Sequence, residues 1–121
     1  MSTVTVVEMW GLRLQSLSNQ RLHWAAMSAQ KKKQRIAVRW ALVGKVTPLL
    51  DAETAEVQLH RIGKRQLDDD NLSTAFKAVR DEVASALGSD DGPKAPITWS
   101  YSQEQGKEYG IRITITVKER E

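Results

Sequence analysis

The stretch Tyr109-Gly110-Ile111-Arg112-Ile113-Thr114-Ile115-Thr116-Val117 places an apolar side chain at every second position. This period of two predicts a β-strand whose apolar side chains share one face of a sheet. Because such a face must be covered by another layer, the segment predicts a sheet with helices packed against it.

Three earlier segments also alternate and are predicted to be strands. They lie at residues 3–14, 56–60 and 97–101. Gly11 is expected to mark a bend in the first of them, and residues 103–107 are expected to form the turn between the last two strands.

A first helix is predicted from a Ser18-Asn19 cap to about Val43, with Gly44 and Pro48 ending it. Its apolar residues recur at helical spacing and are expected to form one stripe, of the kind that faces a core. The stripe comprises Leu22, Ala26, Ala29, Ile36, Trp40 and Val43.

A second helix is predicted over residues 72–87, with Gly88 ending it. Its buried residues are expected to be Leu72, Phe76, Val79, Val83 and Leu87. Lys77 and Asp81 project from the other side of that helix, so Asp81 is expected to pair with Lys77 on its surface. Lys77 is also expected to lean back toward Asp70.

The order of these elements is β-α-β-α-β-β, which predicts an α+β (mixed α/β) fold with two helices packed on a mixed sheet. With 121 residues, the chain is expected to form one compact domain over residues 1–121. Trp24, Trp40, Trp99 and Tyr101 are interpreted as core or dimer contacts, and His60 as a surface histidine at the end of a strand.

The composition excludes several classes of function. The chain has no cysteine, which rules out disulfides, thiolate catalysis and cysteine-ligated zinc. It contains no apolar run near the ~20 residues that span a bilayer, and its N-terminus lacks the pattern of a secretory signal. We therefore expect a cytoplasmic protein without a membrane partner.

Charge is divided unevenly along the chain. Residues 1–50 hold eight Lys or Arg against one acid, a net charge of +7, whereas residues 51–121 hold ten against fourteen, a net charge of −4. A basic region beside an acidic cluster suits a protein that binds a polyanion and holds cations against it. A solvated helix face accounts equally well for the charge pattern alone.

Three carboxylates adjoin one another in Leu67-Asp68-Asp69-Asp70-Asn71-Leu72. A hard divalent cation such as Mg²⁺ takes oxygen ligands of this kind. If the chain is extended there, Asp68 and Asp70 point the same way and Asp69 points away from them. The alternative is that the acids cap the following helix, which is the commoner role for such a pattern.

A second acidic pair, Asp90-Asp91, follows Gly88 at the far end of the second helix. A helix of that length spans roughly 24 Å, so acids that only cap its two ends would not meet. Either a folded-back loop or a dimer would bring them to the first cluster, or they remain in solvent; the residues leave these alternatives open.

Several motifs, in this order, resemble the RusA-type Holliday junction resolvases, most closely their phage and prophage branch. They are Asn19-Gln20-Arg21-Leu22-His23-Trp24, the basic helix, Asp68-Asp69-Asp70-Asn71-Leu72, Lys77-Ala78-Val79-Arg80-Asp81, Leu87-Gly88-Ser89-Asp90-Asp91-Gly92 and Trp99-Ser100-Tyr101-Ser102-Gln103. The resemblance runs over nearly the whole chain.

The resemblance implies a homodimeric endonuclease that depends on Mg²⁺, with Mn²⁺ as a substitute, needs no small-molecule cofactor, and cuts four-way or related branched DNA in bacteria or phage. It implies Asp68, Asp70 and Asp91 as metal ligands, with Asp90 and Asp81 in secondary roles. The better-studied branch has a lysine four residues after the second aspartate, where this chain has Thr74, and Lys77 is its expected substitute.

The basic residues of the first helix and of the segment before Asp68 are expected to contact DNA phosphates without reading bases. They are Lys31, Lys32, Lys33, Arg35, Arg39, Arg61, Lys64 and Arg65. Two other interpretations remain: a non-catalytic nucleic-acid binder whose carboxylates are helix caps or a structural cation site, and a dimeric scaffold.

Overall fold

A computed structural model of the chain describes residues 2–14, 24–90, 92 and 94–119. These residues form a single domain of three helices and a four-stranded mixed sheet, so the predicted α+β fold is confirmed. The elements are β1 (Ser2–Trp10), α1 (Trp24–Leu42), β2 (Glu53–Gly63), α2 (Asp69–Ala75), α3 (Lys77–Ala86), β3 (Ile97–Gln105) and β4 (Gly110–Glu119).

The strand order is β1-β4-β2-β3, with β4 antiparallel to both of its neighbours and β2 parallel to β3. Parallel neighbours need a long crossover, and α2 and α3 supply it. β4 is therefore an inner strand, which explains why Ile111, Ile113 and Ile115 are all buried.

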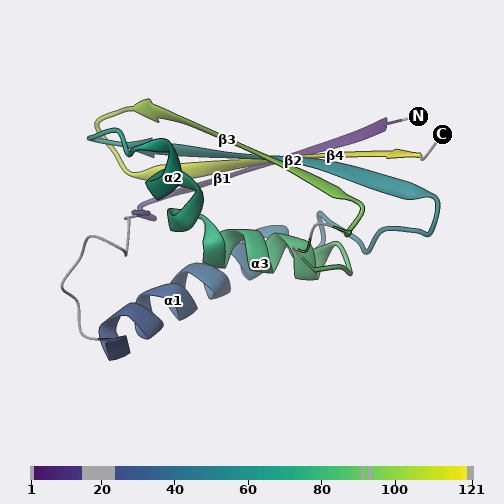
Figure 1. Cartoon of the computed structure of the whole chain (residues 1–121), viewed down its shortest axis with the longest axis horizontal. Helices are drawn as coiled ribbons and strands as arrows, with labels where there is room; N and C mark the ends of the chain where they lie inside the picture. The colour runs from purple at the N-terminus through teal and green to yellow at the C-terminus, as the bar shows by residue number, and fades with distance from the viewer. Residues whose placement is uncertain (1, 15–23, 91, 93, 120–121) are drawn as a thin grey trace.

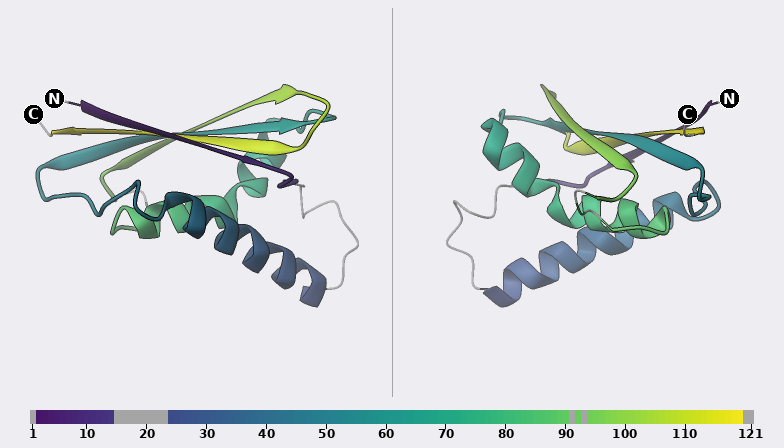
Figure 2. Two further views of the ribbon diagram at one scale, coloured as in Figure 1. Left: turned by 180° about the vertical axis from the view of Figure 1, so that it is seen from behind. Right: turned by 45° about the vertical axis from the view of Figure 1, so that its right-hand side comes forward.

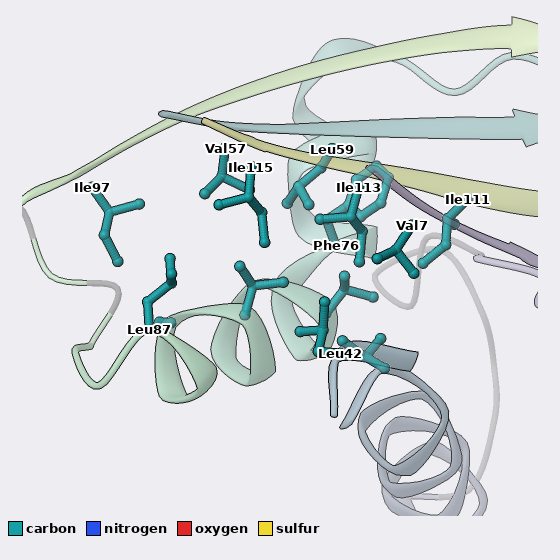
Figure 3. Packing of buried hydrophobic residues seen from close by; sticks show 14 of the residues in the cluster. Val7, Leu42, Val57, Leu59, Phe76, Leu87, Ile97, Ile111, Ile113 and Ile115 are labelled. Atoms are coloured by element: carbon teal, nitrogen blue, oxygen red, sulfur yellow. The ribbon is translucent and has the colours of Figure 1, made fainter. Parts of the chain in front are cut away.

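The helices lie on one face of the sheet (Figures 1 and 2), with α3 nearer to the strands than α1. Side chains from both layers meet between them (Figure 3), including Leu59 and Ile113 from the sheet and Phe76 and Leu87 from the helical layer. No element in the described ranges covers the opposite face, where Val4 and Val6 are exposed. No helix there is long and apolar enough to cross a membrane.

The five predicted buried residues of the second helix are confirmed, namely Leu72, Phe76, Val79, Val83 and Leu87. The prediction of a single helix in this region is wrong. The segment forms two helices, α2 and α3, which are divided at Phe76, where a φ of −88° and a ψ of 2° interrupt the helical backbone. The Phe76 ring is fully buried and lies 6.0 Å from that of Tyr101 on β3. Since no glycine or proline marks this position, the local sequence gives no signal for the break.

The stripe predicted for the first helix is wrong. Ile36, Trp40 and Val43 are 41%, 73% and 60% exposed, while Val38 and Leu42 of α1 are buried. Both sets recur at helical spacing, so periodicity permits either face. Ala29 is also exposed, Leu22 lies outside the described residues, and the side chain of Ala26 is not among those described.

Candidate metal and nucleic-acid site

The carboxylate cluster, Asp68, Asp69 and Asp70, lies at the start of α2 and is fully on the surface. Asp68 is the N-cap residue, yet its side chain makes no capping hydrogen bond. Asp68 contributes to the start of the helix only through its backbone carbonyl, which accepts a hydrogen bond from the Leu72 N–H at 2.8 Å. Exposed carboxylates that are not used as caps suit a hard divalent cation such as Mg²⁺.

The prediction that Asp68 and Asp70 point the same way assumed an extended chain over both residues. The structure corrects this assumption. Asp68 is extended, with φ −63° and ψ 156°, but α2 begins at Asp69. Strand-like alternation therefore does not set the direction of Asp70, and it gives no reason to exclude Asp69 as a ligand.

Asp91, the third predicted ligand, lies outside the described residues. Its neighbour Asp90 is exposed and accepts a hydrogen bond from the Gly92 N–H at 2.8 Å. Within the described part of the chain, no three His, Asp or Glu side chains converge closely enough to hold a metal. The meeting of Asp91 with Asp68 and Asp70 therefore stays a prediction.

Gln103 of β3 holds the backbone directly before the carboxylate cluster. Its side-chain carbonyl accepts from the Leu67 N–H at 2.9 Å, and its side-chain amide donates to the Leu67 carbonyl at 2.7 Å. This double hydrogen bond ties the segment that carries Asp68 to the edge of the sheet. The sequence does not predict this role for Gln103, because Leu67 and Gln103 are 36 residues apart and no local pattern links them.

Lys77 is the first residue of α3 and forms an ion pair with Asp81 at 3.2 Å, as predicted. Thr74 donates its hydroxyl to the Asp70 carbonyl at 2.9 Å. Ser73 donates to the same carbonyl at 3.1 Å. Both hydrogen bonds lie within α2, whereas Lys77 follows the break at Phe76 and begins α3.

Arg35 and Arg39 of α1 converge on Glu82 of α3. Their distances to Oε1 of Glu82 are 3.1 Å and 3.0 Å, and the Glu82 side chain is only 5% exposed. Burial acts to raise the pKa of Glu82, but the hydrogen bonds from Arg39 and Arg35 outweigh it and hold this pKa below its usual value. The hydrogen bond with Glu82 likewise raises the pKa of Arg39.

These two arginines therefore join α1 to α3, although both remain about half exposed and can still meet a polyanion. Glu82 was missed by sequence reasoning. The available signal was its position on the same helical face as Val79 and Val83, because an acid on a buried face requires a cationic partner.

Arg61, another predicted phosphate contact, is instead buried. Its Nε donates to the Leu14 carbonyl at 3.2 Å and its Nη1 to the Arg65 carbonyl at 2.7 Å, and burial lowers its pKa. Arg61 thus shapes the segment that leads to the carboxylates, while Lys64 and Arg65 are exposed on it. Lys31, Lys32 and Lys33 are exposed on α1.

Comparison with protein-family models gives no matching family, and comparison with curated proteins gives no match. Among solved structures, the chain is similar to an FtsZ mutant from M. jannaschii, with 15% identity and a TM-score of 0.42. That match covers 97% of this chain and 27% of the other. A similarity of this size carries no argument about function.

Proposed function

We propose that this protein is a cytoplasmic Mg²⁺-dependent, structure-selective endonuclease that hydrolyses a phosphodiester bond of four-way or related branched DNA. The observation that carries the proposal is the exposed carboxylate cluster. The Asp68 side chain does not cap α2, and Gln103 ties the preceding residue, Leu67, to β3. The motif order shared with the RusA-type resolvases supports the same function.

In this proposal Asp68 and Asp70, together with Asp91, hold the cation. A bound Mg²⁺ supplies Lewis acidity toward a phosphate oxygen and lowers the pKa of a coordinated water. Lys77, which is 56% exposed, places a positive charge where negative charge develops on the phosphate. Lys64, Arg65 and the exposed bases of α1 hold the DNA backbone, so binding is expected to weaken steeply with salt.

The decisive experiment compares cleavage of junction, flap and duplex DNA with and without Mg²⁺. Asp70→Asn is expected to abolish cleavage, a loss of at least about 10³-fold, while junction binding persists because a negative charge has been removed. Asp51→Asn, an exposed acid in the turn before β2, is the matched control and should cleave normally. Cleavage by Asp70→Asn would refute the assignment of the metal site.

Salt-dependent DNA binding by the wild-type chain, without cleavage in Mg²⁺ or Mn²⁺, would favour the alternative of a non-catalytic nucleic-acid binder. Binding to no DNA would leave the scaffold interpretation.

We further propose that the protein acts as a homodimer, since two symmetric cuts across a junction need two related active sites. The exposed apolar surface formed by Ile36 and Trp40 of α1 and by Val43 directly after it supports a second copy as its occupant, because large exposed apolar groups that lie together are typical of interfaces. Trp40→Ser is expected to shift the sedimentation coefficient from dimer to monomer. An unchanged dimer would place the interface elsewhere, and a monomeric wild-type chain would refute dimerisation.

A further inference from the structure

An open hollow of about 340 Å³ lies beside the break between α2 and α3. Ser73, Thr74, Lys77, Arg80 and Tyr101 line it. Two of these five residues are cations, and the Tyr101 hydroxyl adds a possible hydrogen-bond donor, so the lining is suited to an anion. The metal-site proposal uses only Lys77 of this set.

Arg80 is held in one orientation by two aromatic residues of β3. Its Nη1 donates to the Tyr101 hydroxyl at 2.7 Å, and its guanidinium lies 4.7 Å from the centre of the Trp99 ring. Tyr101 in turn packs near the buried ring of Phe76. A guanidinium fixed in this way loses little conformational entropy when it binds an oxyanion, which favours binding.

The Tyr101 oxygen accepts a hydrogen bond from Arg80, so its own hydrogen can be donated to a ligand in the hollow. The hydroxyls of Ser73 and Thr74 donate to the Asp70 carbonyl, which places the hollow next to the carboxylate cluster along α2. An anion in the hollow would therefore lie about one helical turn from Asp70, and Lys77 lines the hollow while pairing with Asp81.

We propose that this hollow binds a phosphodiester group of the same DNA strand, adjacent to the group held at the carboxylates, with Arg80 and Tyr101 as its ligands. The identity of the ligand rests on the proposed endonuclease function. A phosphodiester fits because it presents several oxygens to a planar guanidinium, a tyrosine hydroxyl and an ammonium group from different directions.

The test measures binding of a fluorescent four-way junction by anisotropy in EDTA, where no cleavage occurs, over a range of salt concentrations. Arg80→Gln is expected to raise Kd about tenfold and to reduce the slope of log K against log salt by about one. Tyr101→Phe keeps the ring and should raise Kd about threefold. Arg112→Gln, which removes an equal charge on the open face of the sheet, should leave Kd unchanged.

Arg80→Lys keeps the charge but not the planar fork, so it should weaken binding with little change in slope. If circular dichroism shows that Arg80→Gln does not fold, the binding measurements on Arg80→Lys and Tyr101→Phe still test the proposal. Wild-type Kd in all folded variants would overturn the proposal, as would the absence of DNA binding by the wild-type chain.

The two proposals fail in different ways. Weakened binding by Arg80→Gln in a chain that never cleaves would keep the phosphate site and reject the endonuclease. Normal cleavage by the wild-type chain, together with unchanged binding by the variants, would do the opposite.

Discussion

Helices α3 and α1 are neighbours, but they are held by different forces. α3 lies closer to the sheet than the N-terminal part of α1 does, whereas the C-terminal end of α1 also contacts β1; α3 buries Ala78, Val79 and Val83 completely or nearly so. α1 forms the outer layer: it buries Val38 on one side and leaves Trp40 73% exposed on the other. Its attachment to α3 includes the two arginines that share Glu82.

The difference shows how position in the layers decides what a helix needs. Both the sheet and α1 contact the middle helix, so hydrophobic burial fixes its rotation. Most of α1 packs on one side only, and the pairing of Arg35 and Arg39 with the buried Glu82 helps to decide which side faces α3. The face left over is free for a partner, which is why it carries the dimer proposal.

Truncation of one large side chain on each helical layer tests this contrast most strongly. Phe76→Ala is expected to lower the free energy of unfolding by about 3–5 kcal/mol, because the ring is fully buried and a cavity remains. Trp40→Ala should change it by about 0.5 kcal/mol or less in the dissociated chain. Urea unfolding at low protein concentration measures both, and similar losses would mean that the outer face of α1 is packed within the monomer.

The shared acid between the helices is the next test. Glu82→Gln is expected to cost about 2 kcal/mol, because two charge-assisted hydrogen bonds are weakened at a buried site. Glu56→Gln removes the exposed pair with Lys118 and is the matched control, with an expected loss below about 1 kcal/mol. Equal losses in urea unfolding would show that burial adds nothing to the Glu82 pair.

The same acid predicts the sign of a pH effect. Because the pKa of Glu82 is lower in the folded chain than its ordinary value of 4.5, its contribution to stability is present above that value and is lost as pH falls through the folded pKa. Glu82→Gln should therefore flatten the decline of unfolding free energy on the acid side.

A smaller effect on stability than that of Glu82→Gln is expected at Gln103. Gln103→Met removes both hydrogen bonds to Leu67 and should cost about 1 kcal/mol. If the proposed endonuclease is correct, kcat should fall about tenfold through misplaced carboxylates while junction Kd stays unchanged. Gln105→Met, on the same strand with one long 3.4 Å contact to the Lys64 carbonyl, is the control and should keep its kcat. An unchanged kcat in Gln103→Met would show that Gln103 does not position the carboxylates.

Much of the fold could be predicted from local pattern. The alternation at 109–117 predicted β4 and its buried isoleucines, and the spacing from Leu72 to Leu87 predicted the buried face of the second helix. The pairing of Lys77 with Asp81 was also predictable, because residues four apart on a helix are neighbours.

The sequence by itself determined the order and approximate position of the strands and helices, because these depend on the period of nearby side chains. Their ends were predicted less well: β1 ends at Trp10 and not at residue 14, and residues 103–105, predicted as part of a turn, belong to β3. Only the tertiary structure decided the break at Phe76, the face that α1 buries and the burial of Arg61. It alone brought Glu82 to Arg35, 47 residues away, and Gln103 to Leu67. Contacts between distant residues depend on how the layers pack, and a local period carries no information about that packing.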